Sequence, residues 1–76
     1  MTLAEGKEVL YGYAIAINAL LTEHDESYGA VVQIEAMCGK VAAQLAIDYD
    51  SSPDALIAEA DDRAYMYLNN IEVIDE

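Results

Sequence analysis

The sequence Ser51-Ser52-Pro53-Asp54-Ala55-Leu56-Ile57 contains the clearest helix start in this chain. Either serine can cap the helix through its hydroxyl oxygen, and proline suits the first helical position because it has no N–H to leave unpaired. The aspartate that follows lies near the positive end of the helix dipole. Apolar residues then recur at helical spacing, and they are Ile57, Ala60, Ala64, Tyr67, Ile71 and Ile74. The β-branched residues of 71–74 leave open an extended end.

Two further apolar segments precede this helix, and polar stretches at residues 23–27 and 48–54 separate the three. Residues 3–22 place Leu10, Ala14, Ile17 and Leu21 at helical spacing, and residues 28–47 do the same with Val31, Ile34, Cys38, Val41 and Leu45. A strand over 30–34 is the weaker alternative. We therefore predict one all-α domain over residues 1–76, a small up-down-up three-helix bundle with short loops.

The composition points to association with another protein. Apolar residues make up 55% of the 76 residues, more than one small core can easily cover. This surplus predicts either a homodimer or an apolar face for a partner.

The charge indicates what kind of partner to expect. The chain has fifteen acidic residues and only three basic ones, Lys7, Lys40 and Arg63, so its formal net charge is −12. Such a chain repels nucleic acid and anionic membranes and attracts basic protein surfaces. We expect no direct binding of nucleic acid or membrane. The acidic start of the chain is unlike a signal peptide, and the apolar run at 9–21 is too short to span a bilayer, so we expect a cytoplasmic protein.

The acidic residues concentrate near the expected ends of the helices. In an up-down-up bundle, one end gathers Glu23, Asp25, Glu26, Glu72, Asp75 and Glu76, and the other gathers Glu5, Glu8, Asp48, Asp50 and Asp54. Along the side of the third helix lie Glu59, Asp61 and Asp62. A rod about 30 Å long with this charge can resemble the phosphates of a nucleic acid. The competing interpretation is that charge gathers at the loops of any bundle.

We find no catalytic arrangement and expect neither an enzyme nor a cofactor. The only histidine, His24, lies among acidic loop residues, and Cys38 falls on the apolar spacing of the second helix. Residues 48–59 resemble the calcium loop of EF-hand proteins, but Pro53 stands where that loop needs glycine. A calcium-binding module, or a carrier-type module that uses Ser51, remains an alternative.

Six tyrosines are the only aromatic residues, and tyrosine is enriched at protein interfaces. We expect Tyr65 to point away from the core and Tyr11 to be partly exposed, so both are candidate anchors. In size, charge and helicity the chain resembles the small acidic inhibitors of phages and mobile elements, including anti-CRISPR proteins. This resemblance implies an inhibitor in the host cytoplasm that occupies a basic, nucleic-acid-binding surface of an effector complex. A dimeric structural or regulatory interaction protein is the alternative.

Overall fold

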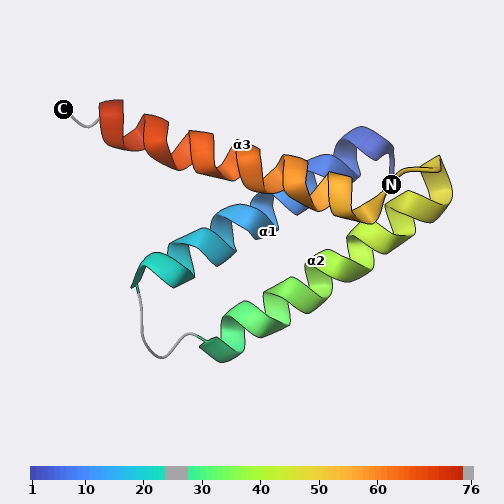
Figure 1. Cartoon of the computed structure of the whole chain (residues 1–76), viewed down its shortest axis with the longest axis horizontal. Coiled ribbons are helices and arrows are strands. Elements are labelled where there is room, and N and C mark those ends of the chain that lie inside the picture. The colour runs from blue at the N-terminus through green and yellow to red at the C-terminus, as the bar shows by residue number, and fades with distance from the viewer. Residues whose placement is uncertain (24–27, 75–76) are drawn as a thin grey trace.

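The helices predicted from the sequence are present in the computed structural model, which describes residues 1–23 and 28–74, with the side chains of 1–21 and 29–70. These ranges form α1 (Leu3–Glu23), α2 (Tyr28–Tyr49) and α3 (Pro53–Ile74), which run up, down and up (Figure 1). The predicted all-α bundle is therefore confirmed. Residues 30–34 and 71–74 are helical, so both extended alternatives are wrong. The helix-propensity penalty of β-branched residues stays below about 0.7 kcal/mol each, too little to end a hydrogen-bonded helix.

Local hydrogen bonds fix the starts of two helices. At α1, the backbone N–H of Thr2 donates to Glu5 Oε1 (2.8 Å) and the backbone N–H of Glu5 donates to Thr2 Oγ1 (3.1 Å), which is a capping box. At α3, the cap is Ser52, whose Oγ accepts from the backbone N–H of Ala55 (3.3 Å). Pro53 is then the first helical residue, as predicted.

The turn between α2 and α3 depends on one residue in the left-handed conformation. Asp50 has φ 56°, and the backbone N–H of Ser51 donates to the carbonyl oxygen of Ala46 (3.1 Å). This is the hydrogen bond of a Schellman motif, which usually places glycine at the left-handed position. The Tyr49 hydroxyl donates to the carbonyl oxygen of Met1 (2.9 Å), so the N-terminus lies beside this turn.

The core is small and consists mainly of short side chains. Leu10 and Leu45 are the large side chains that are fully buried, and each stabilises the fold by about 1.5–3 kcal/mol. The other buried apolar residues are Ala14, Val31, Cys38, Ala42, Leu56, Ala60 and Ala64. Gly6 is buried against Leu45, because a Cβ at this glycine would lie only 2.5 Å from the leucine methyl carbons. The helices α1 and α2 therefore approach closely at their ends nearest the second turn.

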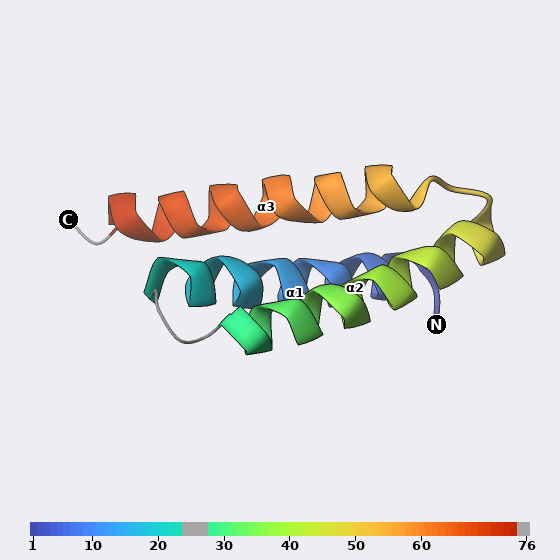
Figure 2. The ribbon, with the colours of Figure 1, turned by 60° about the horizontal axis from the view of Figure 1, so that its bottom comes forward.

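The spacing of the buried residues explains how the helices cross. On α3 the core positions are Leu56, Ala60 and Ala64, a strict four-residue repeat, and α1 repeats it at Leu10 and Ala14. Packing of such four-residue ridges makes helices cross at about 50° instead of the about 20° of a regular bundle. Figure 1 shows α3 crossing α1 obliquely, and Figure 2 shows α3 lying on a layer formed by α1 and α2.

Two residues that the sequence placed in the core are exposed, because the helices cross obliquely. Leu21 is 55% exposed and Tyr67 is 44% exposed, although both lie on the predicted apolar stripes. Core residues spaced alternately by three and four positions stay on one face of a helix. The observed core residues are spaced by four positions, so the line that joins them winds slowly around the helix. Leu56 is therefore the buried residue, whereas Ile57 is half-buried and packs against the core. Ala42 is buried although it was not predicted.

The helix α2 is also apolar enough to be compared with a membrane span. The candidate segment is Gly29–Tyr49, with a mean hydropathy of 1.3. Inside the folded chain, 22% of this segment is buried. By length and composition alone this helix could cross a bilayer, a test that core helices of soluble proteins also pass.

Candidate functional site

An open groove lies between α2 and α3. The two helices diverge from the turn at residues 50–52, and α1 forms the floor between them (Figure 1). The groove has a volume of about 580 Å³. Ala14, Ile17 and Leu21 contribute its floor from α1, and Ile57 and Tyr65 line it from α3. The groove exists because α3 crosses α1 obliquely and leaves one side of the bundle uncovered.

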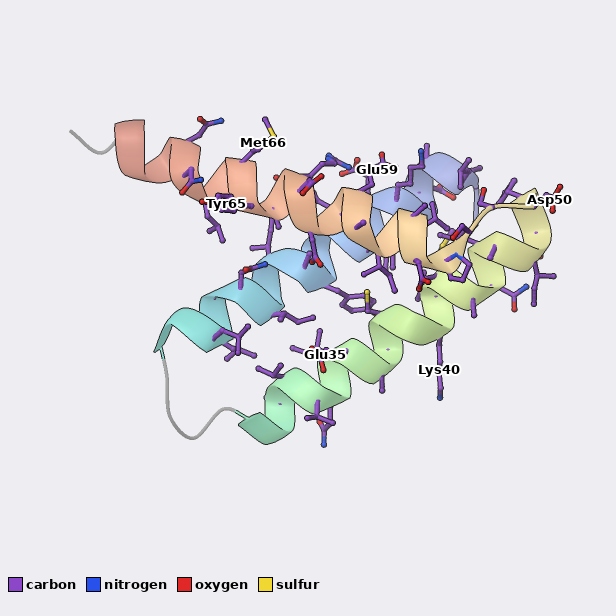
Figure 3. The ribbon with its side chains drawn as sticks, viewed as in Figure 1. Glu35, Lys40, Asp50, Glu59, Tyr65 and Met66 are labelled. Carbon is purple, nitrogen blue, oxygen red and sulfur yellow. The ribbon has the colours of Figure 1, made fainter. Side chains whose placement is uncertain are left out.

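Carboxylates border this apolar groove on both sides. Glu35 lines it from α2, and Asp61 and Asp62 line it from α3. All three residues are exposed. Figure 3 shows Glu35 and Tyr65 directed toward the space between the helices, while Lys40 and Met66 project from the opposite outer sides. Among the described side chains, no lysine or arginine lines the groove.

The single cysteine lies at the inner wall of the groove. Cys38 is 6% exposed, and it belongs to the core cluster as well as to the groove lining. Burial raises the pKa of its thiol, and the negative charges of Asp61 and Glu35 raise it further. The thiol therefore stays protonated near neutral pH, which agrees with a packing role and not with a nucleophile.

A second set of carboxylates surrounds the turn between α2 and α3. We call Glu5, Asp48, Asp50 and Asp54 the end cluster. Glu8 was predicted to belong to this group, but it pairs with Arg63 along the side of the bundle. The hydrogen bond from Tyr49 to Met1 brings the start of α1 to this turn, which confirms that the N-terminus and the second loop meet at one end. All four residues are exposed. Hydrogen bonds from the backbone N–H and then the hydroxyl of Thr2 lower the pKa of Glu5, so it is charged at neutral pH.

Two of the three basic residues are paired within the chain. Lys7 Nζ lies 3.5 Å from Glu59 Oε1, and Arg63 Nη1 lies 3.1 Å from Glu8 Oε2. Both pairs join α1 to α3 on the side of Glu59 (Figure 3). Lys40 forms no ion pair with a described carboxylate. The acidic side chains that are neutralised by ion pairs therefore lie between α1 and α3, away from the groove and the end cluster.

The predicted aromatic anchors have different surroundings. Tyr65 is 60% exposed and lies beside the groove, as expected for a side chain directed away from the core. Tyr11 is half-buried, with the Arg63 guanidinium carbon 4.1 Å from its ring centroid and the Tyr67 ring packed edge-on at 6.2 Å. Tyr11 therefore serves internal packing, and Tyr65 is the better candidate for an anchor.

Several predicted residues lie beyond what the structure describes. Asp25, Glu26, Asp75 and Glu76 lie outside the described residues, as does His24. The backbones of Glu23 and Glu72 are helical, but their side chains are outside the described set.

The geometry of residues 48–59 does not favour the module alternatives. Residues 53–59 form the first turns of α3, and Glu59, the twelfth position of the calcium-loop pattern, pairs with Lys7. Among the described residues, no group of three potential ligands could hold a metal ion. The Ser51 hydroxyl donates to the carbonyl oxygen of Tyr49 (3.4 Å), within the turn.

Three large apolar side chains are exposed on the outer side of α2, where Lys40 also projects. Val32, Met37 and Ile47 are exposed there, by 57%, 44% and 76%. This is part of the apolar surplus predicted from composition, and the described helices leave it uncovered.

The sequence did not single out Glu35, and it placed Asp61 and Asp62 along the side of the third helix. Both differences arise from the helix crossing, which turns α2 and α3 so that these carboxylates line one groove. The only available sequence signal was the four-residue repeat at positions 56, 60 and 64. Comparison with known proteins gave no match to a family model, a curated protein or a solved structure.

Proposed function

We propose that this chain is a protein-binding inhibitor that occupies a basic, nucleic-acid-binding surface of another protein. The observation that supports this proposal best is the uneven distribution of charge. All nine carboxylates with described side chains are exposed, and only Glu8 and Glu59 form ion pairs. The other seven are Glu5, Glu35, Asp48, Asp50, Asp54, Asp61 and Asp62.

The arrangement of these seven residues favours recognition over mere solubility. They form the end cluster and the groove border, which lie about 11 Å apart along α3, as the seven residues from Asp54 to Asp61 indicate. Lysines and arginines that grip nucleic-acid phosphates would meet carboxylates at two separate places on this chain. Such complementarity steers association and selects basic partners.

Salt and nucleic acid together test this function. The immobilised protein is exposed to a nuclease-treated cell lysate, and retained proteins are eluted first with increasing salt and then with duplex DNA or RNA. We expect the retained proteins to be basic nucleic-acid binders that either oligonucleotide displaces. Retention that resists both salt and nucleic acid would contradict the proposal, because screening weakens binding between exposed charges.

A charge-neutralised variant provides the control for this experiment. Six substitutions leave the core untouched and keep Glu5, which forms the capping box. They remove the charges of the groove border and three of the four charges of the end cluster, and they are Glu35→Gln, Asp61→Asn, Asp62→Asn, Asp48→Asn, Asp50→Asn and Asp54→Asn. Retention by this variant should fall to background. A variant that keeps these charges and replaces an exposed residue by a similarly good helix former, Met66→Gln, should retain the same proteins as the wild type.

The outer face of α2 favours a second candidate, a homodimer. Exposed Val32, Met37 and Ile47 would be covered by a second copy, and such a contact would not weaken with salt. Light scattering at low and high salt distinguishes the two functions. Dimer formation that Ile47→Lys abolishes, together with no retained basic protein, would favour the dimer.

A further inference from the structure

The groove has the form of a three-helix surface that lacks a fourth helix. Its floor and walls are mainly apolar, with Ile17 and Leu21 on α1 and Ile57 on α3. Asn18 is the polar residue of the floor, and its side chain donates to the carbonyl oxygen of Ala14. The border carries Glu35 and Asp61. The apolar side chains of this groove therefore offer surface that a bound helix would bury. Leu21 and Tyr65, which are both more than half exposed, are the groove side chains with the most apolar surface still to bury.

The dimensions of the groove fit two turns of a helix. Leu21 follows Ala14 on the floor by seven positions, which corresponds to about 11 Å along α1. The volume of about 580 Å³ falls within the range of sites that bury a ligand. Two apolar side chains at positions i and i+3 or i+4 of an approaching helix are about 5–6 Å apart, and both would reach the floor.

We propose that this groove binds an amphipathic helix of the partner protein, with apolar side chains on one face and lysine or arginine beside them. This proposal rests on the proposed function and specifies how the basic partner is held. The apolar face enters between α2 and α3, and the flanking basic side chains meet Glu35 on one side and Asp61 and Asp62 on the other. Helix-in-groove binding of this type is a common mode of peptide recognition.

Charge favours this occupant over a second copy of the chain. Each copy carries a net charge of −12, so self-association here would bring like charges together around an acidic border. A nucleic acid would suffer the same repulsion from Glu35, Asp61 and Asp62. Of the three candidates, only a basic amphipathic helix can bury apolar side chains on the floor and also place positive charges beside the carboxylates of the border.

A synthetic peptide tests the groove without knowledge of the natural partner. The probe has about 16 residues, with leucines in three-four spacing and lysines elsewhere, which gives one apolar face. A scrambled peptide of identical composition has no such face and serves as the control. Binding is followed by methyl NMR with labelled isoleucine, because Ile17 and Ile57 line the groove and Ile47 lies on the outer side of α2.

We expect the amphipathic peptide to shift the Ile17 and Ile57 methyl signals and to leave Ile47 unchanged. The scrambled peptide, which has the same charge, should bind at least about tenfold more weakly. Shifts centred on Ile47, or equal binding of both peptides, would overturn the proposal.

Two neighbouring substitutions on α3 distinguish binding in the groove from a general effect of added positive charge. Tyr65→Lys places a cation beside the groove, whereas Met66→Lys adds the same charge on the outer side, and both residues are exposed. Tyr65→Lys should weaken peptide binding about tenfold or more, and Met66→Lys less than about threefold. Circular dichroism checks that both variants remain helical. Equal effects of the two variants would overturn the groove proposal.

The two proposals can fail separately. If the peptide avoids the groove while basic proteins are still retained and displaced by nucleic acid, the proposed function stands and the groove proposal fails. If the peptide enters the groove but nucleic acid displaces no retained protein, the groove is a helix-binding site and the inhibitory function is wrong.

Discussion

The close contact between Gly6 and Leu45 leads to a sharp prediction about stability. A Cβ at Gly6 would lie 2.5 Å from both leucine methyl carbons and 3.0 Å from Cγ, and Leu45 is only 2% exposed, so it has little room to move. Overpacking of this kind costs about 1–3 kcal/mol. Replacing glycine by alanine within a helix returns at most about 1 kcal/mol. Gly6→Ala should therefore lower the free energy of unfolding by about 0–3 kcal/mol.

A second glycine on the same helix isolates the packing contribution. A Cβ at Gly12 meets no atom within 4 Å, so Gly12→Ala should stabilise by up to about 1 kcal/mol. The two variants should thus differ by about 1–3 kcal/mol in urea unfolding followed by circular dichroism. In a Leu45→Ala background, which itself costs about 2–5 kcal/mol, Gly6→Ala should become stabilising. Equal stabilisation by both glycine substitutions would refute the close approach of α1 and α2.

Three further predictions concern a turn, an aromatic contact and a helix cap. Asp50→Gly should raise the free energy of unfolding by up to about 1 kcal/mol, because Asp50 has φ 56° and glycine adopts this conformation without strain; a lower thermal midpoint would contradict this. Arg63→Gln should destabilise by about 1 kcal/mol at any salt concentration, because Arg63 lies over the Tyr11 ring, and a loss that vanishes at high salt would show that only the exposed ion pair matters. The folded pKa of Glu5 lies below its ordinary value of 4.5, so the unfolded chain binds the proton first, and the stabilisation is present above pH 4.5 and lost as pH falls through the folded pKa. The difference in thermal midpoint between wild type and Glu5→Gln should therefore change below pH 4.5, and a difference independent of pH would contradict the capping box.

The helices and their starts could be predicted because local chemistry determines them. Pro53 after a capping serine starts α3, and polar residues separate the three apolar segments. The core was predicted less well. Tyr67 and Leu21 lie on apolar stripes of regular spacing, yet both are exposed, because the helices cross obliquely and the true contact line drifts around each helix.

The candidate site depends on that crossing and could be predicted only in part. The acidic residues around the second turn follow from the order of the helices, so Asp48, Asp50 and Asp54 were placed correctly. The groove requires the angle between α2 and α3, which a short sequence pattern does not specify. Glu35 therefore carried no signal of its own in the sequence, although it borders the groove.

Mutual exclusion with nucleic acid tests the central claim most directly. A basic protein retained by this chain is purified, and the anisotropy of a labelled oligonucleotide bound to it is measured as the acidic protein is added. We predict complete displacement, with the apparent Kd of the oligonucleotide rising linearly with the concentration of the added protein and without a plateau. A ternary complex, in which the oligonucleotide stays bound while the acidic protein also binds, would contradict the account.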